Sequence, residues 1–186
     1  MKSKSPESEQ YLSASNRITG VIVLVIGALG LLDIVLEWRT LTGLLVASII
    51  GIFMVLAYVG LMRPSVTLSP EHLLLRNHLR DHLIPWSKVT GVDVTDILRV
   101  HAADAKYRAP GVQLVMRDLR KQRVGGRKLS ADSSISKADF VVNRIEYHQE
   151  QYAAKSEGDA ITRWARPELI AIGVLAVIAA VAALFR

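Results

Sequence analysis

The chain has no cysteine among its 186 residues, which excludes disulfide bonds, thiolate metal sites and cysteine catalysis and suits a reducing compartment. Nor does it contain a serine motif resembling a nucleophile elbow. Gly125-Gly126 is not followed by the Lys-Ser/Thr pair of a phosphate-binding loop. We therefore expect no enzyme activity, no cofactor and no metal ion.

Charged residues are missing from two long stretches, 41–62 and 169–185. A helix of roughly 20 apolar residues crosses a bilayer core, so both stretches are predicted to be transmembrane. A third stretch, 18–38, is apolar until it reaches Asp33 and Glu37, and no signal-peptide cleavage pattern follows it. The sequence thus predicts a helical hairpin over 18–62 and a last membrane helix over 167–186.

The basic residues near these spans predict the orientation. Lys2, Lys4 and Arg17 precede the first span, Arg63 follows the second, and Arg163 and Arg166 precede the third. Because lysine and arginine are enriched on the cytoplasmic side, the N-terminus and the segment between the second and third spans are predicted to be cytoplasmic. The protein is then a multi-pass membrane protein with a polar cytoplasmic tail over 1–17.

Residues 63–155 read as a compact domain, followed by a polar linker over 156–166. Hydrophobic alternation and turn residues predict short strands at 66–69, 71–76, 80–86, 89–98, 112–116 and 127–130, with a turn over 107–111. From residue 136 to 154 the apolar period becomes helical. The expected fold class is α+β, with an antiparallel barrel or sandwich closed by an amphipathic helix.

The expected core of this domain is small. Leu73, Leu75, Ile84 and Trp86 are the apolar positions that two strands would turn inward, and Phe140 leads the apolar stripe of the helix above them. Val141, Ile145, His148 and Tyr152 continue the stripe.

Two short motifs carry a family resemblance. Leu74-Leu75-Arg76-Asn77 is followed after a few residues by Ile84-Pro85-Trp86-Ser87-Lys88-Val89, downstream of a membrane hairpin and Arg63-Pro64. Over roughly residues 50–152 this order resembles bacterial pleckstrin-homology-like (bacterial PH) domain proteins, most of all the small membrane-anchored actinobacterial members. The resemblance implies two roughly orthogonal antiparallel sheets capped by a C-terminal helix. It implies no enzyme activity and no catalytic residues.

Residues 117–128 hold six basic side chains and one acid, and they are candidates for contact with lipid or with a partner. The basic residues are Arg117, Arg120, Lys121, Arg123, Arg127 and Lys128. Near a membrane they would attract anionic headgroups, or they form a solvated hairpin tip. No aromatic residues interleave with them for base stacking, so we expect no nucleic-acid partner.

The remaining polar candidates are weaker. His72, His78 and His82 lack the supporting ligands of a metal site, so we interpret them as surface histidines. Asp96, His101 and Asp104 are likewise interpreted as surface residues. Asp33 and Glu37 share one face of the first span near its outer end, where they would reach water or pair with Arg39.

The sequence favours a noncatalytic PH-like interaction or scaffold module, integral to the membrane, that binds a protein partner or a second copy of itself. Sensing of anionic lipid through residues 117–128 is the alternative. A transporter accessory subunit that uses Asp33 and Glu37 is a further alternative.

Overall fold

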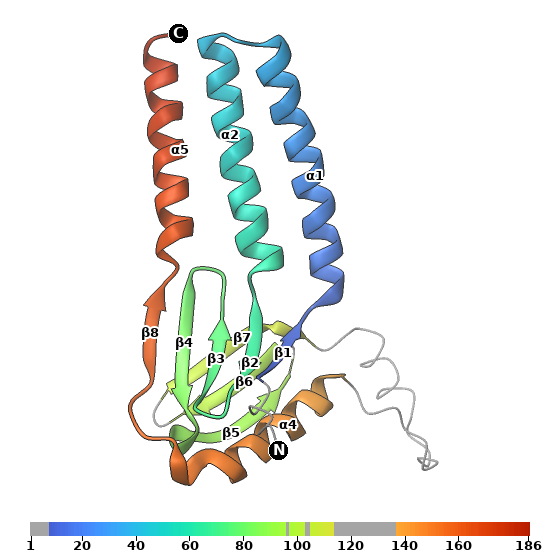
Figure 1. Cartoon of the computed structure of the whole chain (residues 1–186), viewed down its shortest axis with the longest axis vertical. Coiled ribbons are helices and arrows are strands. Elements are labelled where there is room, and N and C mark those ends of the chain that lie inside the picture. Colours follow the sequence, from blue (N-terminus) through green and yellow to red (C-terminus); the bar gives the residue numbers. More distant parts are fainter. Residues whose placement is uncertain (1–7, 96, 103–104, 114–136) are drawn as a thin grey trace, which may run out of the picture. The chain divides into compact units, whose positions relative to one another are not determined.

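The computed structural model describes residues 8–95, 97–102, 105–113 and 137–186 (Figure 1). The chain divides into two compact units. One unit holds residues 1–13, 64–77 and 81–163, and we call it the sheet unit; the other holds residues 14–63, 78–80 and 164–186, and we call it the helix unit.

The helix unit contains α1 (Ala14–Glu37), α2 (Leu41–Ala57) and α5 (Arg166–Leu184). All three segments are long and apolar enough to cross a membrane, and α2 continues into a π-helical segment, η1 (Tyr58–Met62). The helix α2 lies between α1 and α5 (Figure 1). These spans support a membrane protein, in agreement with the uncharged stretches of the sequence.

The turn between α1 and α2 is only three residues long, Trp38 to Thr40. Thr40 caps α2, because its Oγ1 accepts a hydrogen bond from the Gly43 amide at 3.1 Å. A β-carbon at residue 43 would meet the Trp38 carbonyl oxygen at 2.0 Å, so the tight turn needs glycine there. The two helices therefore form the hairpin that the sequence predicts.

The sheet unit consists of two antiparallel sheets and a helix. The larger sheet has the strand order β1-β2-β3-β4-β8, and the smaller has the order β5-β6-β7. The strands of the larger sheet are β1 (Glu9–Leu12), β2 (Ser65–Leu68), β3 (His72–Arg76), β4 (Arg80–Pro85) and β8 (Ile161–Trp164). Those of the smaller sheet are β5 (Val89–Val94), β6 (Ile97–Ala102) and β7 (Ala105–Gln113). Over the residues placed by the structure, the sheets form no closed barrel.

The helix α4 (Lys137–Tyr152) packs on the end of this sandwich, where it contacts β5. Two short 3-10 turns, η2 (Trp86–Lys88) and η3 (Ala153–Lys155), follow β4 and α4. The result is an α+β PH-like fold, as the sequence predicts.

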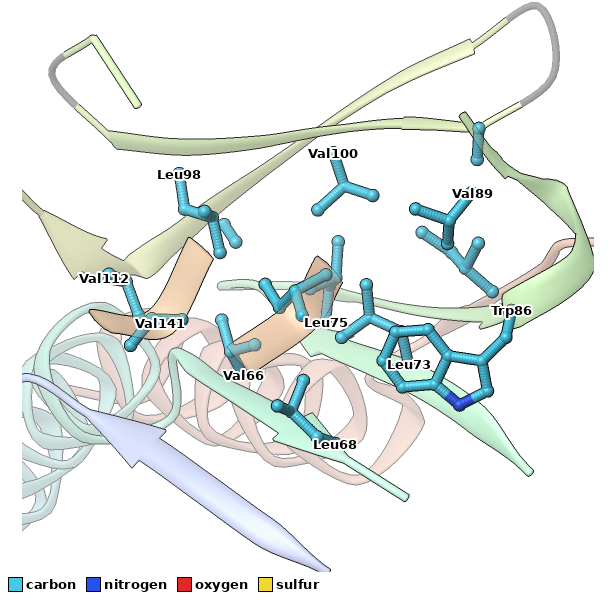
Figure 2. Packing of buried hydrophobic residues seen from close by; sticks show 14 residues of the cluster. Val66, Leu68, Leu73, Leu75, Trp86, Val89, Leu98, Val100, Val112 and Val141 are labelled. Atoms are coloured by element: carbon cyan, nitrogen blue, oxygen red, sulfur yellow. The ribbon is translucent and has the colours of Figure 1, made fainter. Parts of the chain in front are cut away.

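The core between the sheets is apolar and continuous (Figure 2). Leu73, Leu75, Ile84 and Trp86 all have 0% exposure. From α4, Val141 and Ile145 enter the same cluster, also at 0% exposure. The alternation of β3 explains this placement, because residues two apart in a strand point to the same face.

Phe140 does not join this core, so its predicted position is wrong. The side chain is 50% exposed, and it packs edge-to-face against Tyr11 of β1 with the ring centroids 6.2 Å apart. Successive helical residues differ by about 100° in direction, so when Val141 faces the sheets its neighbour turns toward the surface.

The turn predicted at residues 107–111 is also wrong, because these residues lie inside β7. The pairing shifts where Ile97 faces Gln113 and Leu98 faces Ala109, so residues 110–112 form a bulge. Pro110 fits there because a bulge does not require its missing N–H. A β-carbon on Gly111 would lie 2.8 Å from Ser65 Cα, so glycine allows β7 to pass close to β2.

Two strands arise where the sequence indicates only a tail and a linker. β1 comes from the polar residues before α1, and it pairs with β2 from Glu9–Leu68 to Leu12–Ser65. β8 comes from the polar segment after α4 and lies beside β4. The tail and the linker thus supply both edges of the larger sheet.

Candidate functional site

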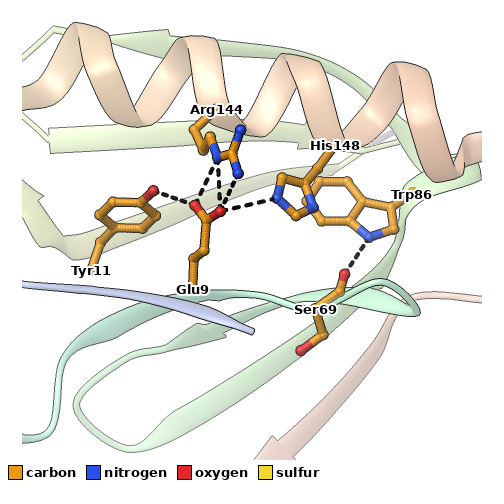
Figure 3. Close-up of polar contacts among 6 residues, drawn as sticks. All are labelled: Glu9, Tyr11, Ser69, Trp86, Arg144 and His148. Atoms are coloured by element: carbon orange, nitrogen blue, oxygen red, sulfur yellow. Dashed lines mark hydrogen bonds and ion pairs between the residues drawn. The ribbon is translucent and has the colours of Figure 1, made fainter. Parts of the chain in front are cut away.

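The face of the sheet unit formed by β1 and α4 gathers charged and aromatic side chains (Figure 3). We call it the β1–α4 face, and it comprises Glu9, Tyr11, Phe140, Arg144, Tyr147 and His148. Tyr147 and His148 follow Arg144 in α4 by three and four residues. Side chains at this spacing lie next to one another on the helix surface.

Glu9 is the centre of its polar contacts. Its carboxylate accepts hydrogen bonds from Nε and Nη2 of Arg144, the Nε bond to Oε2 being 2.8 Å, and from the Tyr11 hydroxyl at 2.6 Å. The hydrogen bonds from Arg144 lower the pKa of Glu9 to about 2, and the same pair raises the pKa of Arg144 above its ordinary value. Burial, together with the bond to Glu9, raises the pKa of Tyr11 to about 12.

His148 lies behind this pair and is 5% exposed. Its ring stacks on Trp86 at 5.5 Å between centroids, and its Nε2 lies 3.8 Å from Glu9 Oε1, too far for a hydrogen bond. Neither ring nitrogen has a hydrogen-bond partner among the side chains and backbone that the structure places. Burial lowers the pKa of His148, which favours the neutral imidazole.

Trp86 connects this face to the core. Its Nε1 donates a hydrogen bond to the Ser69 carbonyl at 2.8 Å, and its backbone amide donates to Ser156 Oγ at 2.9 Å. Ser156 Oγ in turn donates to the Glu71 carbonyl at 2.8 Å. Ser156, which follows α4, is therefore hydrogen-bonded both to the residue before β3 and to the residue after β4. The Trp86 indole itself is fully buried.

The chemistry of the β1–α4 face suits binding. The pKa values of Glu9 and Tyr11 move away from neutrality, whereas acid–base catalysis requires values near the working pH. Phe140 and Tyr147 are 50% and 46% exposed, and Arg144 lies over the Tyr147 ring at 5.0 Å. Exposed aromatic rings beside an arginine are the residue types enriched in protein interfaces.

The six basic residues predicted to contact lipid or a partner lie outside the described residues: Arg117, Arg120, Lys121, Arg123, Arg127 and Lys128. Asp96 and Asp104 also lie outside them. At the end of α1, Asp33 and Glu37 are exposed, while Arg39 Nε donates to the Val35 carbonyl at 3.1 Å.

The predicted surface histidines are dispersed. His78 is exposed, His82 Nδ1 lies 2.9 Å from Thr162 Oγ1, and His101 Nε2 lies 2.6 Å from Asp93 Oδ1. The bond with His101 lowers the pKa of Asp93. No group of three or more metal-ligating side chains occurs in the part of the chain that the structure places.

Sequence reasoning missed Glu9, Tyr11 and Arg144 as parts of one site. Glu9 and Arg144 are separated by 135 positions, and no spacing rule joins a polar N-terminal segment to a helix that far away. The sequence does place Arg144 beside the apolar stripe of the helix. An arginine that packing partly covers needs a carboxylate partner, but the sequence does not say which one.

Comparison with known families agrees with this fold. The family model described as a bacterial PH domain matches residues 63–130. No curated protein and no solved structure matches the chain. The chain thus carries a bacterial PH-like domain, and such a domain suggests a noncatalytic interaction module.

Proposed function

We propose that this protein is a membrane-anchored interaction module, which presents its PH-like domain at the cytoplasmic face of a bacterial membrane and binds a protein partner there. The observation that carries the proposal is a bacterial PH domain match at residues 63–130, between the second and third apolar helices. Because the interior is filled by its own side chains, binding takes place on the domain surface.

The pairing of β1 with β2 supports the arrangement in the membrane. These strands flank the α1–α2 hairpin and are hydrogen-bonded to each other, so they lie on the same side of a bilayer. The basic residues near the spans favour the cytoplasmic side for both.

Single-cysteine variants test this orientation, since the chain has no cysteine of its own. Thr90→Cys on β5 should react with a membrane-impermeant maleimide only after the cells are permeabilised, whereas Arg39→Cys in the hairpin turn should react in intact cells. Both positions are exposed. Labelling of Thr90→Cys in intact cells would contradict the cytoplasmic placement.

The β1–α4 face is the surface we assign to the partner. Its exposed Phe140 and Tyr147 rings already contact the Tyr11 ring and the Arg144 guanidinium, respectively, so they lose less freedom on binding than rings without such contacts. A stable partner would cover these rings and leave the buried His148 and Trp86 unchanged.

Photo-crosslinking in native membranes tests the assignment. A photoreactive phenylalanine analogue at position 140 or 147 should give one discrete adduct, whose mass distinguishes a second copy of this chain from another protein. The control position is the exposed Lys106 on β7. Equal adducts from all three positions, or no adduct from positions 140 and 147, would contradict the assignment of the β1–α4 face to a partner.

Anionic-lipid contact through residues 117–128 is a second candidate, supported by their six basic side chains. The full chain would be reconstituted into vesicles with or without anionic lipid and treated with trypsin, which cleaves after lysine and arginine. A variant with serine at Arg120, Lys121, Arg123, Arg127 and Lys128 identifies the fragments that arise from cleavage at these residues. Protection of these residues from trypsin in wild type by anionic lipid alone supports the candidate. Cleavage that is indifferent to lipid charge refutes it.

A further inference from the structure

The three membrane helices leave an open groove, of about 510 Å³, within the helix unit. It is lined by Leu24 of α1, Met54 and Val55 of α2, Tyr58 of η1, and Pro167 and Ala171 of α5. All six positions lie within helices apolar enough to cross a membrane. The volume falls in the range of ligand sites. Because its lining residues belong to the three spans, the groove lies where a membrane supplies lipid.

The groove lies toward the end of the spans where α1 begins, η1 ends and α5 begins. Its last lining residue, Glu168, is paired with Arg63, whose Nε lies 2.8 Å from Oε1 of the carboxylate. These side chains are only 8% and 14% exposed, so the pair presents little net charge to an occupant. The carboxylate therefore does not repel an anion at this end.

Arg17 provides a positive charge beyond the groove. It lies seven residues before Leu24, which places it on the same face of α1, two turns or about 10.5 Å nearer the start of the helix. Its side chain is exposed. Tyr58 is 42% exposed and adds a hydroxyl that donates a hydrogen bond.

We propose that the groove binds an anionic phospholipid, with one acyl chain against the apolar lining and the phosphate at Arg17 and Tyr58. The apolar lining suits an acyl chain, and Arg17 suits a phosphate. A phospholipid carries both groups in one molecule. This inference rests on the membrane insertion in the proposed function and is independent of the partner on the β1–α4 face.

Native mass spectrometry of the full chain tests the proposal, after extraction into detergent with equal amounts of phosphatidylglycerol and phosphatidylcholine. Arg17→Gln should lower the retained ratio of phosphatidylglycerol to phosphatidylcholine about fivefold, the effect of one basic residue near the lipid. Arg17→Lys should restore part of it. The matched control is Arg39→Gln at the other end of the hairpin, which should leave the ratio unchanged.

A second pair of variants tests the chain-binding part. Ala171→Phe fills the groove and should reduce retention of both lipids, whereas Ala176→Phe is exposed on the opposite side of α5 and should not. Wild-type retention by both Arg17→Gln and Ala171→Phe overturns the proposal, as does an equal loss in Arg39→Gln.

Alkaline carbonate extraction separates failure of this inference from failure of the proposed function. Release of the wild-type protein from membranes refutes the membrane anchoring itself. Retention in membranes, together with unchanged lipid ratios in the variants, refutes only the lipid site.

Discussion

Trp86 belongs to two systems at once, the apolar core and the polar contacts of the β1–α4 face. Its ring is fully buried in the same cluster as Leu73 and Leu75 and stacks on His148, while its indole N–H donates to the Ser69 carbonyl. Removing the ring therefore opens a cavity and also leaves the partly buried Ser69 carbonyl without this donor.

We expect Trp86→Ala to reduce the free energy of unfolding of the sheet unit by roughly 3–5 kcal/mol. Trp86→Phe should cost less, because it keeps most of the packing and loses mainly the hydrogen bond. Urea unfolding of the full chain in detergent, followed by circular dichroism, measures both. An unchanged unfolding curve for the alanine variant would mean that the ring is not part of the core.

The pH dependence of stability follows from Glu9 and His148. Both pKa values are lowered in the folded state, so both groups bind protons more readily in the unfolded chain. Their stabilising effect is complete above the unfolded values of 6.5 for His148 and 4.5 for Glu9. It is lost as the pH falls through the folded values.

Between pH 7.5 and 5.5 we therefore expect the sheet unit to lose stability through His148, which Glu9 attracts and Arg144 repels. His148→Phe keeps a ring against Trp86 and removes the titration, so its midpoint should change less over this range. Thermal unfolding at the two pH values is the measurement. Equal pH dependence in both proteins would show that His148 is not responsible.

At the scale of elements, β7 depends on a close approach that only glycine permits. The bulge at residues 110–112 carries Gly111 over the backbone of Ser65 in β2. A side chain at this position must push two strands apart, because the atoms it meets are backbone atoms that cannot rotate away.

Gly111→Ala should destabilise the sheet unit by roughly 1–3 kcal/mol through overpacking. The matched control is Gly91→Ala in β5, where an added β-carbon meets nothing within 4 Å, and its effect should stay within about 0.5 kcal/mol. The two variants are compared by urea midpoint. Similar midpoints would indicate that β2 and β7 can separate freely at Ser65.

The same elements show how far the sequence alone could lead. The alternation of β3 and β4 and the uncharged spans follow from local patterns, and the structure places them accordingly. The β6–β7 pair was not predicted. The sequence indicates one strand over 89–98, where the structure has β5 and the start of β6, and Pro110-Gly111 is a turn signal that tertiary packing converts into a bulge. The β1–α4 face could not be predicted, since its charges meet only after the sheet has formed.

At the scale of the whole molecule, the PH-like fold is discontinuous in the chain. β1 precedes the α1–α2 hairpin and its partner β2 follows it, so the hairpin is inserted between two neighbouring strands. Glu9 also joins β1 to α4 through its hydrogen bonds with Arg144, so the first strand contacts both the larger sheet and the helix.

Deleting residues 1–12 should therefore expose the edge of β2 and release Arg144 from its partner. We expect amide exchange in Ser65–Leu68 to accelerate about tenfold or more, which corresponds to a loss of about 1.4 kcal/mol. A chain that lacks only residues 1–7 keeps β1 and is the control. The expectation fails when both deletions exchange like wild type.

Because the α1–α2 hairpin separates β1 from β2 in the chain, the two strands can pair only when both helices of the hairpin have crossed the membrane. If only one helix of the hairpin crossed the bilayer, β1 and β2 would emerge in different compartments and could never meet. The larger sheet would then keep a bare edge, open to aggregation or proteolysis. A quality-control protease that cuts unpaired β2 would thus discard chains with a wrong number of crossings, without any receptor that counts helices.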